Sequence, residues 1–192
     1  MPSSKPSSRR LPISTRAVLE PDGSIRRDLR VFCPKDDATL DIETCMTCPA
    51  CVGLDARPDA DGRPAVCCGF EGLAAERSAR PVGSVLARFA AAVHVGALPL
   101  GHTPAPYGSP VAIVDDDLRI VGVFERNGSI RPDDGSLSVA IEEHVTLPAA
   151  LSRMARHRQR SAPVVAASGV FVGAFDDLDA LRALRDVPRP AR

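Results

Sequence analysis

Two stretches in the C-terminal half share one pattern of apolar and polar positions. Residues 112–126 and 163–177 align without gaps, and each consists of an apolar run, a short polar turn and a second apolar run that contains Val-Gly-x-Phe. The identical pairs are Val114/Val165, Val121/Val172, Gly122/Gly173 and Phe124/Phe175. Short apolar runs on both sides of a polar turn are typical of a β-hairpin. The pattern therefore predicts an internal repeat with one hairpin in each copy.

Helical periodicity flanks the second copy. Before it, residues 146–159 place Thr146 at an N-cap position and Pro148 in the first turn, and their apolar residues follow one helical face. After it, residues 176–186 begin with acids, carry arginines towards their end and repeat leucine at helical spacing, which suits the helix dipole. The second unit is therefore predicted to run helix, strand, strand, helix.

The N-terminal part differs in composition from this half. Residues 1–16 are rich in Ser, Pro and Arg and have little to bury, which predicts a disordered tail. The sequence Pro-Asp-Gly-Ser at 21–24 is a turn signal and predicts a short hairpin. We expect a hairpin and cysteine-rich module over 17–72, the main core over 80–187 and a short tail at 188–192.

The second unit resembles a known family. Residues 142–185 contain, in order, an entering strand, a Thr-Leu helix start, an Ala-Pro-Val-Val strand, a Val-Gly strand and an acidic final helix. This order resembles the CBS domain, the β-α-β-β-α module named after cystathionine β-synthase, which usually occurs as a tandem pair. Residues 80–130 resemble a degenerate first repeat, because three prolines within 102–110 exclude a regular helix. The resemblance implies an α/β (α+β) fold, a second repeat at 136–187 and a possible homodimer.

The same resemblance implies a ligand site, since CBS pairs commonly bind adenosine nucleotides between their repeats. It places Asp176 where a Ser or Thr usually meets phosphate, and Asp179 where an Asp usually holds the ribose; in the first repeat these positions are Glu125 and Gly128. A carboxylate about 4 Å from a phosphate costs roughly 4 kcal/mol at an effective dielectric near 20. We therefore expect an adenosine or S-adenosyl ligand rather than a phosphorylated one. Asp177 and Asp179 also fit a plain helix N-terminus.

Six cysteines crowd into one segment of the chain. They are Cys33, Cys45, Cys48, Cys51, Cys67 and Cys68. Cys45-x-x-Cys48 is the spacing with which a tight turn offers two thiolates to one tetrahedral ion, and Cys33 with either Cys67 or Cys68 completes a four-thiolate set. A structural zinc site of this kind stabilises a segment by about 10 kcal/mol or more. The cysteines therefore predict structural zinc.

Two other interpretations of the cysteines stay open. Cys45, Cys48 and Cys51 match the opening of a bacterial ferredoxin run, which favours an iron–sulfur cluster, but no cysteine lies three residues further on. Unligated thiols are the second alternative. Because six thiols exceed four ligands, a redox-responsive metal site is a further hypothesis.

Charge and hydropathy exclude several partners. Basic and acidic residues number 24 each, so no net charge is available to hold nucleic acid. The sequence has no secretory signal and no apolar run long enough for a membrane span, which predicts a cytoplasmic protein. Its high proline and alanine content, with few lysines, is typical of a GC-rich bacterial genome.

Enzyme motifs are absent from the sequence. It has no phosphate-binding Gly-rich loop, no dinucleotide fingerprint, no Gly-x-Ser-x-Gly elbow and no paired metal-binding histidines. We therefore expect a non-enzymatic regulatory or sensory protein that binds a small ligand or partner through a CBS pair. One alternative is a metal or redox sensor whose CBS-like half dimerises, and another is an accessory subunit of an enzyme.

Overall fold

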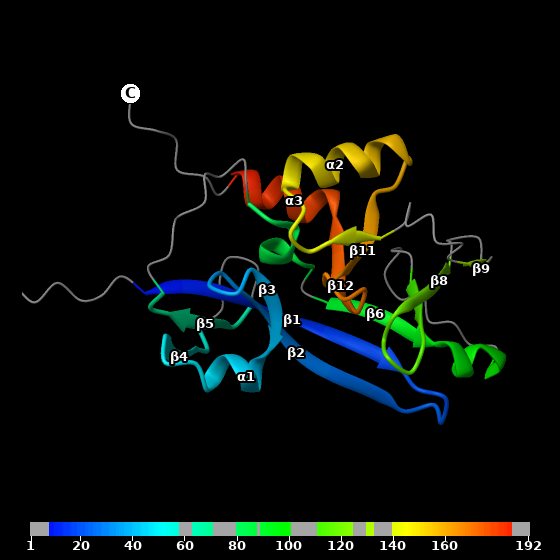
Figure 1. Cartoon of the computed structure of the whole chain (residues 1–192), viewed down its shortest axis with the longest axis horizontal. Coiled ribbons are helices and arrows are strands. Elements are labelled where there is room, and N and C mark those ends of the chain that lie inside the picture. Colours follow the sequence, from blue (N-terminus) through cyan, green and yellow to red (C-terminus); the bar gives the residue numbers. More distant parts are fainter. Residues whose placement is uncertain are drawn as a thin grey trace, which may run out of the picture.

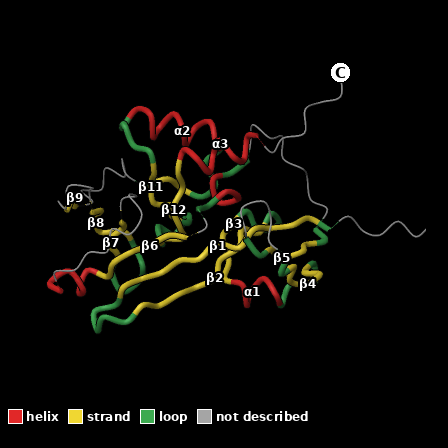
Figure 2. The backbone as a smooth tube through the Cα atoms, turned by 180° about the vertical axis from the view of Figure 1, so that it is seen from behind, coloured by secondary structure: helices red, strands yellow, loops and turns green. Residues whose placement is uncertain are grey.

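The computed structural model describes residues 8–57, 63–70, 80–87, 89–100, 111–124, 130–132 and 140–185. Within them the strands form a nine-stranded sheet and a three-stranded sheet. The two longer helices lie together on one side of the molecule, and a long hairpin lies on the opposite side (Figure 1). The reverse view shows the same arrangement (Figure 2).

The larger sheet has the order β3-β2-β1-β6-β7-β8-β9, with β5 paired to β1 and β4 paired to β5. Its strands are β1 (Arg9–Leu19), β2 (Ile25–Cys33), β3 (Ala38–Asp41), β4 (Cys51–Asp55), β5 (Ala65–Cys68), β6 (Phe89–His94), β7 (Val111–Val114), β8 (Ile120–Phe124) and β9 (Ile130–Pro132). The smaller sheet contains β10 (Ile141–Glu142), β11 (Ser161–Val165) and β12 (Phe171–Asp176). The helices are α1 (Ile42–Met46), α2 (Leu147–Arg156) and α3 (Asp177–Arg185), with 3₁₀ turns at Val82–Val85 and Val95–Leu100.

The structure confirms the predicted repeat of hairpins. β7 and β8 pair antiparallel, as do β11 and β12, and each hairpin receives a parallel strand on its first member, β6 and β10 respectively. Leu118 and Gly169 occupy equivalent turn positions and both have positive φ, 60° and 82°. The turns also meet, because Arg119 bridges Val170 and the Phe171 N–H donates to the Leu118 carbonyl at 2.8 Å. The two copies therefore contact each other through equivalent positions.

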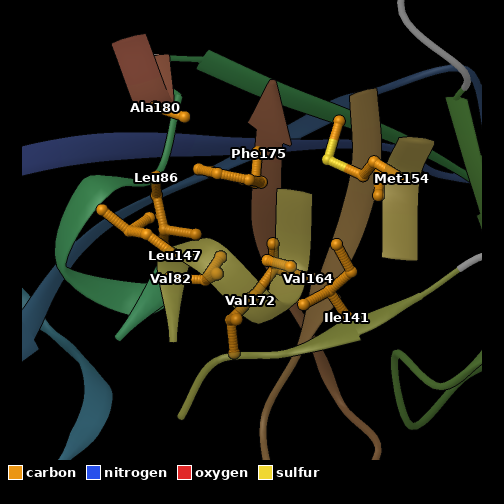
Figure 3. Close-up of a cluster of buried hydrophobic side chains, with 11 residues drawn as sticks. Val82, Leu86, Ile141, Leu147, Met154, Val164, Val172, Phe175 and Ala180 are labelled. Atoms are coloured by element: carbon orange, nitrogen blue, oxygen red, sulfur yellow. The ribbon is translucent and has the colours of Figure 1, made fainter. Parts of the chain in front are cut away.

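The second unit follows its sequence pattern and gains one unexpected segment. As predicted, α2 starts after Thr146 and α3 follows β12 directly. Both helices lie against the three-stranded sheet (Figure 1). The core also contains Val82 and Leu86, which lie far earlier in the chain (Figure 3). The Ala87 N–H donates to Ala174 O at 2.8 Å. Residues 80–87, predicted as the start of the first repeat, therefore complete the core of the second.

The predicted disordered tail over 1–16 is wrong for residues 9–16. They form most of β1, which pairs with β2, β5 and β6. Leu11 and Ile13 are buried in this strand, so its apolar positions do have a core to cover them. The hairpin predicted at 21–24 is confirmed, since Glu20 N–H donates to Ser24 O at 2.9 Å.

β1 connects the cysteine-rich segment to the CBS-like half. It lies between β2 and β6, so strands from both parts share one sheet. Arg16 of β1 adds a side-chain link: its guanidinium binds Asp28 at 2.6 Å and the Phe171 carbonyl at 2.6 Å. The Pro-rich stretch at 102–110, which we expect to replace a helix, lies outside the described residues.

Candidate ligand-binding pocket and cysteine cluster

A pocket of about 320 Å³ lies where the N-terminal strands meet the second unit. Its described lining residues are Arg10, Pro12, Arg63, Ala65, Arg80, Ser84, Val85, Asp179, Arg182 and Ala183. Four of these are arginines and one is a carboxylate, so the pocket carries a positive charge. A smaller pocket of about 100 Å³ shares Arg10, Pro12, Arg80 and Ser84 with it and extends towards Phe32. The two form one arginine-rich depression.

Asp179 is the buried acid of this pocket. Its side chain is 6% exposed, and one carboxylate oxygen, Oδ1, lies 3.4 Å from Arg63 Nη2 and 3.5 Å from Arg182 Nη1. The other oxygen, Oδ2, is buried and accepts no hydrogen bond from the described part of the chain. Burial, reinforced by the charge of Asp176, raises the pKa of Asp179 to about 6, although Arg63 and Arg182 oppose the shift. Asp179 is therefore a buried acid with a raised pKa, and one of its oxygens has no hydrogen-bond donor within the described ranges.

Asp176 immediately precedes α3 and caps the start of that helix. Its Oδ1 accepts the Asp179 N–H at 2.7 Å, and Asp176 is not among the residues that line the pocket. A carboxylate that accepts a backbone N–H in the first turn of a helix acts as a cap. Asp176 therefore lies outside the lining of this pocket, but its charge still acts on the pocket residue Asp179. Glu125 and Gly128 lie outside the described residues.

Sequence reasoning missed all four pocket arginines, of which Arg63 is the most deeply buried. It precedes β5, yet its side chain is 8% exposed and reaches the second unit, where Nη1 donates to Leu86 O at 2.8 Å. A buried guanidinium is costly unless acceptors surround it, and here Leu86 O and Asp179 supply them. In the sequence Arg63 stands in a polar stretch between Gly and Pro that is typical of a surface loop, so no local signal identifies it.

Four of the other five cysteines lie near enough to Cys45 to affect its pKa. Burial, with smaller contributions from the thiols of Cys51, Cys33, Cys68 and Cys48, raises the pKa of Cys45 to about 11. These side chains come from the end of β2, α1, the turn after α1, the start of β4 and the end of β5. Cys67 is not among these neighbours. In the sheet it lies opposite Arg10 of β1 and Gly53 of β4, and it is one of the groups that raise the pKa of Arg57.

Two details distinguish individual thiols. The pKa of Cys33 is raised by burial, and hydrogen bonds from the backbone N–H groups of Asp36 and Lys35 offset only part of that rise. Cys51 faces Cys68 across β4 and β5, and Gly69 N–H donates to Ala50 O at 2.8 Å just beyond this pair. That pattern makes Cys51 and Cys68 a non-hydrogen-bonded pair, in which Cα atoms stand about 4.5 Å apart.

None of the six cysteines, all within the described ranges, forms a disulfide. Among the described residues, no group of three or more His, Cys, Asp or Glu side chains is already arranged to hold a metal ion. Zinc and the iron–sulfur cluster stay predictions at this point.

A family model of the CBS domain matches residues 138–186. The prediction of a CBS domain in the C-terminal part of the chain is therefore confirmed. No curated protein matches the sequence. Of the described helices, none is long and apolar enough to cross a membrane.

Several solved structures show weak similarity. One is a cystathionine β-synthase pair domain from Shewanella oneidensis MR-1, at 16% identity over 56% of this chain and 71% of that chain, with a TM-score of 0.43. Another is CBSX2 in complex with AMP, at 17% identity over 42% and 74%, with a TM-score of 0.37. A third is an uncharacterized conserved protein from Pyrococcus horikoshii, at 19% identity over 59% and 98%, with a TM-score of 0.42.

Proposed function

We propose that the protein is a regulatory CBS-domain module, not an enzyme, and that it binds a small anionic ligand in the arginine-rich pocket. The observation that supports this proposal is Asp179, whose buried Oδ2 has no donor among the described residues while arginines line the same pocket. A ligand that brings both hydroxyl donors and a negative charge would satisfy both features. A phosphorylated nucleoside such as an adenosine nucleotide has this chemistry.

The charges favour the phosphorylated form of that ligand. A unit charge pair at about 4 Å is worth roughly 4 kcal/mol at an effective dielectric of 20, and guanidinium groups bind phosphate through paired hydrogen bonds. Asp179 opposes an anion when it is ionised, and because its pKa is raised to about 6 this opposition weakens as the pH falls below about 6. A sugar hydroxyl that donates to Asp179 would leave the phosphate to Arg10, Arg80 and Arg182.

The pocket also offers a route from ligand to regulation. Arg10 belongs to β1, Arg63 precedes β5, Arg80 precedes the Val82–Val85 turn and Arg182 lies on α3. A ligand held by all four would tie the N-terminal strands to the second CBS unit. Binding would then stabilise the conformation in which these parts are in contact over one in which they are apart. A ligand must distinguish two conformations in this way in order to regulate a protein.

Thermal unfolding of the full chain with ATP, AMP, adenosine and inorganic phosphate tests the proposal. A ligand at about 100 times its Kd stabilises the folded state by about 2.7 kcal/mol, so we expect ATP or AMP to raise the Tm clearly. Arg182→Ala should abolish that rise, because Arg182 is half exposed and can be removed without opening the core.

Arg160→Ala is the matched control, because Arg160 is 86% exposed and its only described ion pair is with Asp177, outside the pocket. It should retain the ligand-induced rise. If no nucleotide raises the Tm more than phosphate does, or if Arg160→Ala loses the rise as Arg182→Ala does, the proposal is wrong.

A further inference from the structure

Two cysteines lie directly opposite each other on the neighbouring strands β4 and β5. These strands pair antiparallel, and Cys51 of β4 is the register partner of Cys68 of β5 (Figure 1). Gly69 N–H donates to Ala50 O at 2.8 Å, so the two cysteines form a non-hydrogen-bonded pair. We propose that this pair is an oxidation site, at which a peroxide converts the two thiols into a reversible cross-strand disulfide.

The strand geometry suits such a bond. Opposite residues of a non-hydrogen-bonded pair have Cα atoms about 4.5 Å apart and side chains on the same face of the sheet. Disulfides form at Cα separations of about 4.4–6.8 Å. The packing agrees with the register, because Cys68 belongs to a buried group with Leu11, Ile13 and Val66, and Cys51 packs against that same group. Both thiols therefore face one side of the sheet, and rotation of their side chains is enough to join them.

The adjacent Cys67 has no thiol opposite it. The register shifts between Cys51 and Gly53, so Cys67 lies opposite Gly53 on β4 and opposite Arg10 on β1. Successive side chains of a strand point to opposite faces, and Cys67 does not belong to the buried group that contains Cys68. Cys51 and Cys67 are both partly exposed, so exposure does not distinguish them. The opposing thiol does.

The two thiols differ in access, and this difference assigns their roles. Cys51 is partly exposed, whereas Cys68 is 8% exposed. The Cys51 thiolate attacks one oxygen of the peroxide, the O–O bond breaks, and Cys51 becomes a sulfenic acid while the other oxygen leaves as water. The Cys68 sulfur then attacks the Cys51 sulfur, the S–O bond breaks, and a second water molecule leaves. One hydrogen peroxide molecule is thereby reduced to two water molecules, and two thiols are oxidised to one disulfide.

The bond would close a segment of chain that reaches the ligand pocket. Arg63 lies between Cys51 and Cys68, and its Nη2 is 3.4 Å from Asp179 Oδ1. A disulfide restricts the conformations open to the segment that it closes. Oxidation would therefore oppose local opening of the segment that carries this arginine. The oxidation site itself does not depend on the proposed ligand, because its residues and its test are different.

Treatment of the reduced full chain with hydrogen peroxide, in the presence of a metal chelator, tests the proposal. Alkylation of the remaining thiols followed by mass spectrometry should show a fall from six free thiols to four. A protease that cleaves before aspartate separates the two cysteines, because Asp55 lies between them. We therefore expect a Cys51 peptide linked to a Cys68 peptide, and dithiothreitol should release the two.

Variants identify the two sulfurs and their order of reaction. Cys51→Ser should abolish the link. Cys67→Ser is the matched control and should form it as the wild type does, because Cys67 is also partly exposed and lies next to Cys68. In Cys68→Ser the sulfenic acid of Cys51 has no partner, so dimedone should label Cys51 after peroxide treatment.

The peptide mapping of the unaltered chain keeps the test valid even if Cys68→Ser does not fold. A chain that retains all six thiols under peroxide would overturn the proposal. A disulfide between Cys48 and Cys51, or between Cys45 and Cys68, in place of the expected one would also overturn it. So would equal loss of the link in Cys67→Ser and Cys51→Ser.

Discussion

Replacement of Asp179 by Asn should make the protein more stable at neutral pH. The pKa of Asp179 is raised from its ordinary 3.8 to about 6, which corresponds to about 3 kcal/mol. The folded state therefore binds a proton more tightly than the unfolded state. Wild-type stability should fall as the pH rises from about 4 to about 6, and the loss should be complete above that range. Asn carries no charge, so the variant escapes this loss.

The magnitude can be measured by urea unfolding between pH 4 and pH 8. We expect Asp179→Asn to gain up to about 3 kcal/mol over the wild type at pH 7 and to gain little at pH 4. The critical quantity is how the difference in unfolding free energy between variant and wild type changes with pH. The variant also loses Asp179 as an acceptor for Arg63, but this loss is present at every pH and cancels when values at two pH are compared.

Asp177→Asn is the control, since Asp177 lies on the same helix but is 35% exposed and paired with the exposed Arg160. An exposed ion pair contributes about 0–1 kcal/mol, so this variant should follow the wild-type curve closely. Parallel stability curves for wild type and Asp179→Asn would refute the argument that burial raises the pKa of Asp179.

Two further substitutions test the hairpin turn and the outer face of α3. Gly169 has a φ of 82°, and a Cβ there would meet no atom within 4 Å. Gly169→Ala should therefore lower the free energy of unfolding by about 1–2 kcal/mol through the backbone alone. Urea unfolding measures this loss, with Ser168→Ala as the control. Leu178 and Leu181 are 53% and 60% exposed on α3, and we expect them to support self-association. Leu181→Glu should therefore shift sedimentation from dimer to monomer; a monomeric wild type would contradict this expectation.

Local patterns allowed the second unit to be predicted in detail. Its hairpin, its Thr146 cap and its final helix depend on neighbouring residues, so sequence periodicity is sufficient to identify them. The part of β1 over 9–16 was missed because Ser, Pro and Arg dominate its surroundings, and the two buried residues Leu11 and Ile13 are a weak signal without their partner strands.

The pocket was only partly predictable for the same reason. Asp179 follows from a family pattern close to the hairpin, but Arg63 reaches it from 116 residues earlier in the chain. Val82 and Leu86 likewise enter a core whose other members begin at Ile141. Contacts at such separations depend on how the sheets assemble, which no short window of sequence contains.

The central position of β1 has a consequence for how the chain folds. Its parallel partner β6 begins at Phe89, so β1 emerges from the ribosome long before that neighbour is made. One edge of β1 stays unpaired during this interval, and exposed edges can pair with other chains. Parallel pairing over a long connection is also intrinsically slow. We therefore expect the joining of β1 to β6 to be a late step in folding, and the nascent chain to depend most on chaperones before it.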